Sequence, residues 1–351
     1  MTRSKSSRTL PAEWAPQSGV MLTWPHAHGD WATHLDAVEQ VYLQLAQTIC
    51  LHELLLVICH DPEHQTHVQR LLESVEIDPS RIRFARQASN DSWARDHGPI
   101  TVSDNGQPRL LDFQFNGWGN KYPHDLDNRI TAGLHAAGLF GATPLESHQL
   151  VLEGGSIDSD GEATLLTTRA CLGHPGRNPQ LSLADIEQQL KQLLGVERIL
   201  WLEQGELVGD DTDSHIDMLA RFCNPRTIAH SACTDPNDEH FASLSAMQQE
   251  LATLRRSDGQ AYDLVALPIP QAIYNQAGNR LPASYANFLI INEAVLVPLY
   301  GDPADALALE RLGACFPTRE VVGINCGAVI EQFGSLHCLT MQLPEGVLNA
   351  I

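Results

Sequence analysis

Residues 53–62 read E-L-L-L-V-I-C-H-D-P and join a continuous apolar run to a helix start. The apolar run is typical of a strand that is buried on both faces. Asp61 is a preferred N-cap residue, and Pro62 suits the first helical position because that position needs no hydrogen-bonded N–H. Upstream, apolar residues recur at helical spacing. The sequence therefore predicts, in order, a helix over 35–51, a strand over 53–59 and a helix over 61–76.

The same alternation continues along the rest of the chain. Further strands are predicted at 20–24, 82–84, 99–103, 109–115, 150–153, 163–168, 197–202, 217–223, 262–267, 286–291, 294–298, 319–322 and 337–342. Further helices are predicted at 126–138, 182–194 (with Ser182 as cap), 237–255 and 303–313. This alternation is typical of an α/β architecture. Because no Gly/Ser or Pro run divides the chain, we expect one domain over residues 11–351 after a disordered tail over residues 1–10.

The composition of the 351-residue chain is that of a globular protein, with 43% hydrophobic residues. Its formal net charge of -21 argues against a nucleic-acid or anionic-membrane partner, since phosphate binding needs a basic surface. The same charge favours cationic ligands. No apolar run is long enough for a signal peptide or for the ~18 residues of a membrane helix. The eight cysteines are scattered without a C-x-x-C pair, so we expect a soluble cytoplasmic protein with free thiols.

Residues 209–217, G-D-D-T-D-S-H-I-D, place four carboxylates and one imidazole close together. An apolar run follows, so the first three aspartates are expected on a loop that enters a strand. In a strand, residues two apart share a face, so the side chains of His215 and Asp217 would project together. Such a pair fits a metal site, a general acid/base pair, a clamp for a cationic ligand or a solvated acidic turn.

Two polar turns next to predicted strands carry further carboxylates. In N-D-S-W-A-R-D-H-G-P (90–99), Trp93 beside Asp96 could line a pocket for a flat cation through stacking and charge. An ion pair between Asp96 and Arg95 is the alternative. In E-G-G-S, Glu153 ends an apolar strand, and the two glycines let the backbone approach a ligand closely. A structural loop is the alternative in both places.

Cys338, in G-S-L-H-C-L-T, has the most site-like context of the eight cysteines. A thiolate near an imidazole is an activated nucleophile, whereas a buried strand cysteine is the alternative. If Cys338 attacks a carbon that is held between carboxylates, and His215 handles protons, the substrate must be a cation. A guanidinium fits because it is planar, permanently charged and matched by carboxylates in bidentate pairs.

Together these motifs resemble those of the agmatine deiminases and the bacterial-type peptidyl-arginine deiminases, in the guanidino-group-modifying (pentein) superfamily. The resemblance runs from P-A-E-W at Pro11 to L-H-C-L-T-M-Q near the end of the chain. It includes W-A-R-D-H-G-P (93–99), F-Q-F-N-G-W-G-N-K-Y (113–122), E-G-G-S-I (153–157), R-N-P (177–179), G-D-D-T-D-S-H-I-D (209–217) and H-C (337–338). Several ordered motifs at family-like spacing are more specific than any single motif.

The resemblance implies a five-bladed pseudo-symmetric α/β propeller, the pentein fold, built of ββαβ units with a central active site and with no metal or cofactor. The functional residues of the family fall on Cys338 (nucleophile), His215 (acid/base), Asp96 and Asp217 (guanidinium binding) and Glu153 (orientation of the histidine and substrate contact). The residues implied to line the pocket are Trp93, Trp118 and Asp211.

The implied reaction is hydrolytic deimination of a small cationic guanidine through a covalent amidino-cysteine. Agmatine, converted to N-carbamoylputrescine and ammonia, is the leading substrate, and free or peptidyl arginine is the alternative. A homo-oligomer stays open. Departures from the family pattern bear on the shape of the pocket: they are Gly334-Ser335-Leu336 before His337-Cys338 in place of G-G-G-N-I, Ser214 in place of glycine, and His97 in place of Thr or Ser.

Two functions of other classes stay open as well. Residues 213–217, D-S-H-I-D, superficially match the D-A-H-x-D metal run of manganese ureohydrolases such as agmatinase, although the sequence has no second cluster of the D-x-D-x-x-D-P type. A non-enzymatic binder of polyamines or arginine would use the same carboxylates as a clamp, but it would need neither the thiol nor the imidazole. The product, ammonia or urea, and the sensitivity to chelators or to thiol alkylation distinguish these functions.

Overall fold

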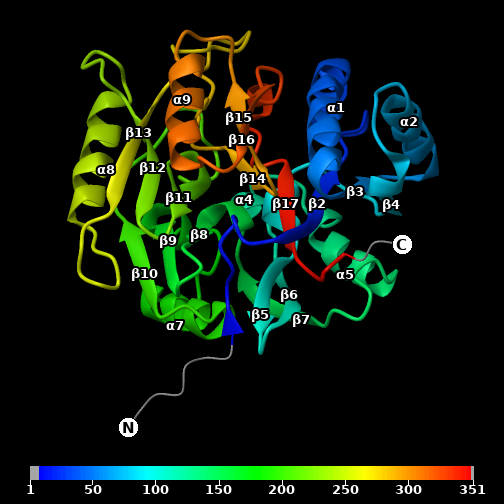
Figure 1. The fold of residues 1–351 in the computed structure, drawn as a ribbon, viewed down its shortest axis with the longest axis horizontal. Coiled ribbons are helices and arrows are strands. Elements are labelled where there is room, and N and C mark those ends of the chain that lie inside the picture. The colour runs from blue at the N-terminus through cyan, green and yellow to red at the C-terminus, as the bar shows by residue number, and fades with distance from the viewer. Residues whose placement is uncertain (1–7, 349–351) are drawn as a thin grey trace.

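The computed structural model describes residues 8–348, which form an α/β fold with five separate sheets. The sheets lie inside and the long helices outside (Figure 1). In spatial order the sheets contain β17 (Thr340–Pro344), β2 (Gln17–Thr23), β3 (Leu54–Cys59) and β4 (Ile82–Arg86); β1 (Arg8–Thr9), β5 (Ile100–Asp104), β6 (Gln107–Gln114) and β7 (Leu145–Val151); β10 (Arg198–Leu202), β9 (Thr164–Thr168) and β8 (Ile157–Ser159); β11 (Ala220–Asn224), β12 (Thr227–Ala232) and β13 (Asp263–Pro268); and β14 (Leu289–Ile291), β15 (Ala294–Leu299) and β16 (Glu320–Asn325).

Each sheet repeats one pairing pattern, in which an antiparallel pair is followed by a parallel neighbour. A helix lies in the crossover between the two parallel strands, because parallel strands cannot be joined by a tight hairpin. These crossover helices are α1 (Leu35–His52), α5 (Ile130–Ala136), α7 (Leu183–Leu194), α8 (Phe241–Thr253) and α9 (Asp305–Cys315). Each unit therefore consists of an antiparallel pair of strands, a helix, and a third strand that runs parallel to its neighbour.

Strand β17 completes the first sheet and so joins the two ends of the described chain. It pairs antiparallel with β2, with Thr340 opposite Leu22, and the two strands lie side by side in Figure 1. Strand β2 in turn runs parallel to β3. This pairing fixes the turn that precedes β17, which carries Cys338.

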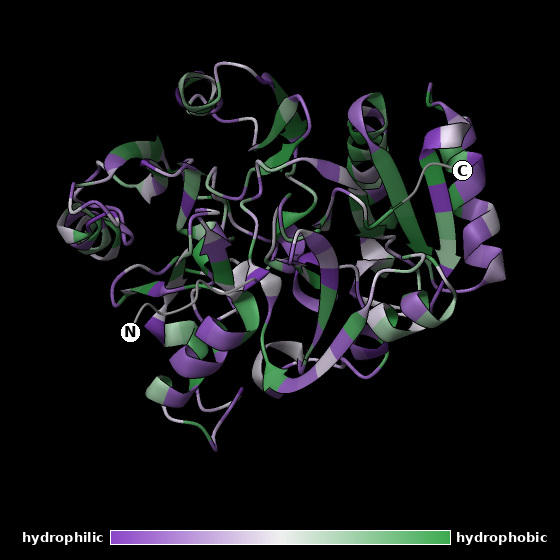
Figure 2. Cartoon of the chain, turned by 60° about the horizontal axis from the view of Figure 1, so that its bottom comes forward, coloured by the Kyte–Doolittle hydropathy of each residue, from purple (hydrophilic) through white to green (hydrophobic). Residues whose placement is uncertain are grey.

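The core forms where the strands meet the inner faces of the helices. All of β3 and nearly all of β2 are buried. Figure 2 shows many of the strands as largely hydrophobic, while the helices carry both hydrophobic and hydrophilic residues. In α7, for example, Ile186, Leu190 and Leu194 are buried at intervals of four residues. The buried strands thus form a rigid frame that presents the loops at their ends.

The local signals in the sequence predicted several elements correctly. The helix predicted after Asp61 is α2 (Pro62–Glu73), and the Asp61 side chain accepts a hydrogen bond from the backbone N–H of His64 at 2.8 Å. Ser182 caps α7 in a reciprocal capping box with Asp185. The predicted α1 and β3 also form, with boundaries within one residue of the prediction.

The strand predicted over 217–223 is wrong at its start. Strand β11 begins only at Ala220, and the three residues Ile216–Met218 form a 3-10 helix, η5. Asp213 and Ser214 have φ angles of 67° and 68°, in the left-handed region. The Asp210 carboxylate stabilises this turn by accepting a hydrogen bond from the Ser214 N–H at 2.7 Å. His215 and Asp217 therefore lie on a turn, not on one face of a strand.

Other differences lie at strand boundaries and at the start of the chain. The strands predicted from 150, 286 and 337 are β7, β14 and β17, which begin at Leu145, Leu289 and Thr340. Strands β8 and β12 were not predicted, because their sequences, I-D-S and T-I-A-H-S-A, mix polar and small residues. Of the tail expected to be disordered, residues 1–7 lie outside the described residues. Arg8 and Thr9 pair with β5, so the expectation of disorder was wrong for them.

Within residues 8–348, no helix combines the length and the apolar character needed to cross a membrane.

Candidate active site

Four short segments meet where strands end. They are α3 (Ala94–His97), the 3-10 helix η4 (Gly154–Ser156), η5 and the turn before β17. The helix α3 packs against η4 and β17, and η4 packs against η5. The fold thus brings together motifs that are separated by more than two hundred residues in the sequence.

Gly155 is the point at which three predicted site residues converge. A Cβ atom at Gly155 would lie 2.6 Å from His215 Nδ1, 2.8 Å from Asp96 Oδ1 and 3.0 Å from Asp217 Oδ2. Real Cβ atoms do not approach so closely, so only glycine lets the backbone pass among these side chains. The convergence of His215 and Asp217 is therefore present, although it arises from a turn.

Asp96 is held rigidly from two sides. Its Oδ2 accepts a hydrogen bond from Trp118 Nε1 at 2.9 Å, and its Oδ1 accepts one from the Gly155 N–H at 3.0 Å. Burial raises the pKa of Asp96 to about 6, helped by the neighbouring carboxylates and opposed by His215. The alternative ion pair with Arg95 does not form, because the Arg95 guanidinium pairs with Glu13.

Asp217 is also buried, but its two oxygens differ. Oδ2 contacts His337 Nδ1 at 2.9 Å and lies 3.6 Å from Cys338 Sγ. Oδ1 is buried without a hydrogen-bond partner among the described residues. Burial opposes ionisation, but the bond from His337 and the charges nearby outweigh it and lower the pKa of Asp217. One oxygen of an ionised carboxylate is thus left free in the interior.

His215 is fully buried, and neither ring nitrogen meets hydrogen-bond geometry with a described residue. Its Nδ1 lies 3.7 Å from Asp96 Oδ1. Burial disfavours the imidazolium, but Asp96, Cys171 and Glu153 outweigh burial and raise the pKa of His215 well above its usual value. The ring is therefore charged at neutral pH and can give up a proton.

Glu153 lies close to His215 but is bound by an arginine. Both of its carboxylate oxygens accept hydrogen bonds from Arg177 Nε, at 2.9 and 3.0 Å, and both side chains are fully buried. Ligand atoms of Glu153, Cys171 and His215 lie within 4.8 Å of one another, the spacing at which three such groups can hold a metal ion. Because the Glu153 carboxylate already pairs with the Arg177 guanidinium, this cluster is poorly suited to bind a metal ion.

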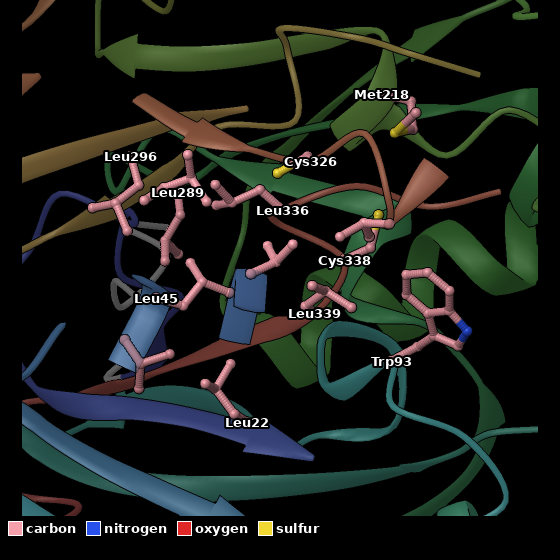
Figure 3. Close-up of a cluster of buried hydrophobic side chains, with 14 of the residues drawn as sticks. Leu22, Leu45, Trp93, Met218, Leu289, Leu296, Cys326, Leu336, Cys338 and Leu339 are labelled. Atoms are coloured by element: carbon pink, nitrogen blue, oxygen red, sulfur yellow. The ribbon is translucent and has the colours of Figure 1, made fainter. Parts of the chain in front are cut away.

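Cys338 lies at the edge of the hydrophobic core, with only 5% of its surface exposed. Figure 3 shows it beside Leu336 and Leu339, with Trp93 at the same edge of the cluster. The Asn287 amide donates a hydrogen bond to Sγ at 3.2 Å. Burial, together with the charges of Asp217 and Asp96, raises the pKa of the Cys338 thiol well above its usual value.

The raised pKa predicts that the thiol of the free protein alkylates slowly. Because only the thiolate reacts, the rate at which iodoacetamide modifies Cys338 should be low at pH 7 and should still be rising beyond pH 9. Peptide mass mapping against pH measures this rate, with free cysteine (pKa about 8.5) as the reference. A rate that is already maximal at pH 7 would contradict the prediction.

A pocket opens onto Cys338, and all three side chains that the resemblance implied as its lining are there. Its walls include Trp93, Trp118 and Asp211, and the further lining residues are Asp30, Asp91, Asp96, Tyr122, Thr212, Gln332, Phe333 and Gly334. The Asp211 carboxylate accepts a hydrogen bond from the Tyr122 hydroxyl at 2.6 Å. The pocket therefore combines aromatic walls with several carboxylates, as a flat cation requires.

The departures from the family pattern have local structural roles. A Cβ at Gly334 would lie 2.2 Å from a ring carbon of Trp93, so glycine is needed for the indole to line the pocket. Ser335 bonds to the Tyr300 hydroxyl at 2.9 Å, and Leu336 is fully buried. The His97 ring turns from the pocket toward Thr23, 3.3 Å from its hydroxyl.

Two residues that support the site, Arg177 and Asn287, were not predicted from the sequence as site residues. Arg177 binds Glu153 and Asp213, and Asn287 binds both the Cys338 thiol and the turn before it. Arg177 belongs to the R-N-P motif, which could have pointed to it. Asn287 lies in no motif, and only the fold places it beside the thiol.

The side chains of D-S-H-I-D do not gather around one point, as a ureohydrolase metal run requires. Asp213 is engaged by Lys121 Nζ at 2.8 Å and by Arg177 Nη1 at 2.7 Å. Asp217 is engaged by His337. The two carboxylates thus serve different partners.

Comparison with known proteins agrees with this geometry. The sequence-family model of the Porphyromonas-type peptidyl-arginine deiminases matches residues 9–344 of this chain. The chain belongs to this family. A putative agmatine deiminase of Vibrio parahaemolyticus is 34% identical over 95% of this chain and 96% of its own length.

Solved structures of the family superimpose closely on this deiminase-family chain. The putative arginine deiminase of Porphyromonas gingivalis is 50% identical, with a TM-score of 0.91 over 97% of this chain and 100% of its own. An agmatine deiminase of C. jejuni with substrate bound is 36% identical, with a TM-score of 0.89 over 97% of each chain. The family resemblance seen in the motifs is therefore confirmed, and the chain is a hydrolase that acts on carbon–nitrogen bonds.

Proposed function

We propose that the protein deiminates agmatine to N-carbamoylputrescine and ammonia through a covalent amidino-cysteine. The observation that carries this proposal is the arrangement at Gly155, where Asp96, Asp217 and His215 converge, with the Cys338 thiol 3.6 Å from Asp217. The unpartnered Oδ1 of Asp217 supports it, because a buried ionised oxygen is costly unless a cation pairs with it. A guanidinium would supply that cation, and in this proposal it binds Asp96, which lines the pocket, and the free oxygen of Asp217.

In the first half of the reaction, the bound guanidinium offsets the carboxylate charges that raise the pKa of Cys338, so the thiol loses its proton to solvent. The thiolate adds to the guanidino carbon and forms a carbon–sulfur bond. His215, charged in the free protein, gives its proton to the departing nitrogen, and the carbon–nitrogen bond breaks to release ammonia. A cationic amidino-cysteine and a neutral His215 remain.

In the second half, neutral His215 takes a proton from water as the water oxygen adds to the same carbon. The carbon–sulfur bond then breaks, the ureido product leaves, and the second proton of the water–amidine adduct returns the sulfur to a thiol. His215 ends as imidazolium, so the enzyme is restored. Asp96 and Asp217 hold the cation throughout, and Glu153 lies close enough to orient the imidazole.

The chemistry of the pocket favours agmatine over arginine. Asp30, Asp91 and Asp211 lie along its walls, and none of its lining residues within the described chain is Lys or Arg. A substrate ending in an amine therefore finds carboxylates, whereas the α-carboxylate of arginine finds like charge. The C. jejuni and V. parahaemolyticus relatives carry the agmatine deiminase name, which agrees with this assignment.

We expect kcat/KM for agmatine to exceed that for free arginine by at least about 100-fold, because unpaired or repelled charges cost several kcal/mol in a partly dry site. Ammonia release from agmatine, arginine and a blocked peptidyl-arginine, measured side by side, tests this. The Asp211→Asn variant should lower kcat/KM for agmatine but not for arginine, so the ratio of the two should fall. Faster turnover of arginine or peptidyl-arginine would assign the site to that substrate.

The same assay separates the proposed function from its rivals. A deiminase releases ammonia and is stopped by thiol alkylation, whereas a manganese ureohydrolase releases urea and is stopped by chelators. A non-enzymatic binder of polyamines or arginine would release neither product. Urea as the product would overturn the proposal.

We further propose that the five sheets are the blades of a pentein propeller in one catalytic domain, with the pocket on its axis. The repeated pairing pattern and the return of β17 to β2 support this arrangement. We expect the reaction to take place in the cytoplasm, in polyamine synthesis, since the product is one hydrolysis away from putrescine. All eight cysteines are free, as a reducing compartment requires.

A further inference from the structure

Glu13, in the segment before β2, contacts four side chains next to the active site. Its carboxylate accepts hydrogen bonds from Arg95 Nη1 at 3.2 Å and from Gln342 Nε2 at 2.9 Å, and it is bound by Arg221 Nη2 as well. Its Oε1 also lies 2.9 Å from His337 Nε2. One carboxylate thus ties together α3, β11, β17 and the turn that carries Cys338.

Glu13 is ionised in this environment. Burial opposes the charge, but Arg221, His337 and Arg95 outweigh burial and hold the pKa of Glu13 well below its usual range. The carboxylate does not line the substrate pocket. Its two oxygens are already engaged by Arg95, Arg221, Gln342 and His337, so it is not available to bind a substrate.

His337 joins Glu13 to the guanidinium clamp, by which we mean the carboxylates of Asp96 and Asp217. The buried ring contacts Glu13 through Nε2 and Asp217 Oδ2 through Nδ1, each at 2.9 Å. Since an ionised carboxylate only accepts hydrogen bonds, each contact needs a proton on the ring nitrogen that makes it. Burial, Arg221 and Arg95 lower the pKa of His337, whereas Glu13 and Asp217 raise it. The short contacts at both nitrogens favour the doubly protonated ring. The backbone N–H of His337 donates to Asn287 Oδ1 at 2.8 Å, which fixes the base of the side chain. The ring is held at three points.

This arrangement fixes the rotation of the Asp217 carboxylate. With Oδ2 bound to His337, Oδ1 is left as the buried oxygen without a partner in the described chain. Without the bond to His337, the Asp217 carboxylate could rotate. Oδ1 would then no longer be fixed in the position where it meets the substrate guanidinium. A misplacement of about 1 Å in such a group can cost about 100-fold in rate.

We propose that Glu13 and His337 are positioning residues for the guanidinium clamp: His337 sets the orientation of Asp217, and Glu13 sets the orientation of His337. Neither residue contacts the substrate in this scheme. The inference rests on the proposed deiminase function and extends it to the first segment of the chain, whose P-A-E-W motif has no other role in the site.

The first test compares two buried glutamates. Glu13→Gln should raise KM for agmatine and lower kcat, so that kcat/KM falls by about 10- to 100-fold. The matched control is Glu53→Gln, because Glu53 is also buried and also accepts a hydrogen bond, from the Asn292 N–H at 2.8 Å, but it lies outside this network. The control should keep the wild-type kinetic constants. The melting temperature of each variant is measured in parallel.

The second test separates positioning from simple loss of fold. In His337→Asn the amide N–H can replace Nδ1 and still reach Asp217, whereas in His337→Gln it replaces Nε2 and reaches only Glu13. The proposal predicts that His337→Asn retains at least about tenfold more kcat/KM than His337→Gln. In the double variant Glu13→Gln/His337→Gln, the losses should be less than additive, because the residues act in one chain.

The outcomes are distinct. A lower melting temperature for Glu13→Gln with unchanged kcat and KM would make Glu13 a structural residue and overturn the proposal. Equal activity of His337→Asn and His337→Gln would do the same for His337. If the wild-type protein releases no ammonia from agmatine or arginine, the proposed function fails first, and this inference falls with it.

Discussion

Cys338→Ala is expected to abolish ammonia release while agmatine still binds. The change removes only the sulfur, and without a nucleophile the guanidino carbon is too stabilised by resonance for water to attack. We expect kcat to fall by at least about 10⁴-fold. The clamp should survive, because the bonds that Asp96 receives from Trp118 and Gly155 do not involve the thiol.

Two measurements make this prediction specific. Calorimetry on Cys338→Ala should still detect agmatine, and a brief incubation of the wild type followed by acid quenching should leave an amidino-sized mass on the Cys338 peptide. Cys233→Ala is the control, since Cys233 is a more exposed thiol that does not line the pocket. Normal turnover by Cys338→Ala would sink the covalent mechanism.

Removal of either charge of the clamp should have the next largest effect. Asp96→Asn and Asp217→Asn are each expected to lower kcat/KM for agmatine by about 10²- to 10³-fold, because a charge-assisted bond to the guanidinium is lost in a dry site. Both variants should raise KM. Asp96→Asn should do more, since Asp96 is the main charge that raises the pKa of His215.

The direction of that second effect follows from the role of His215. The imidazolium must be protonated to release ammonia, and its folded pKa is raised by Asp96. Without that charge the pKa falls, so the alkaline limb of the kcat profile should move to lower pH in Asp96→Asn. Asp217→Asn should move this limb in the same direction but less, because Asp96 is the larger influence on His215. Asp185→Asn, on the surface at the start of α7, controls for a general acid-to-amide effect. Unchanged kinetics in either clamp variant would remove that aspartate from the clamp.

The sequence predicted those parts of the fold that local chemistry determines. The apolar run of β3, the cap at Asp61 and the capping box at Ser182 are signals within one turn of the chain, and each element formed as expected. Family motifs likewise pointed to a common site, and Asp96, His215 and Asp217 do converge. Their roles in catalysis stay predictions until the variants are measured.

What the sequence did not predict depends on contacts between distant segments. The turn at η5 needs the Asp210 side chain to bond back to Ser214, so periodicity alone read it as a strand. Arg177 reaches Glu153 and Asp213 only after folding. Asn287 and Glu13 meet the turn of Cys338 from about 50 and more than 300 residues away. Such pairings leave no local pattern.

The pairing of β17 with β2 determines when, during synthesis, the protein can become active. The turn that carries the thiol is held by the last strand of the described chain and by Glu13 near its start. During synthesis, the ribosome makes the clamp long before it makes Cys338 and the strand behind it. A nascent or truncated chain can therefore fold much of its core and still be inert. Activity then reports that translation has passed Cys338 and β17.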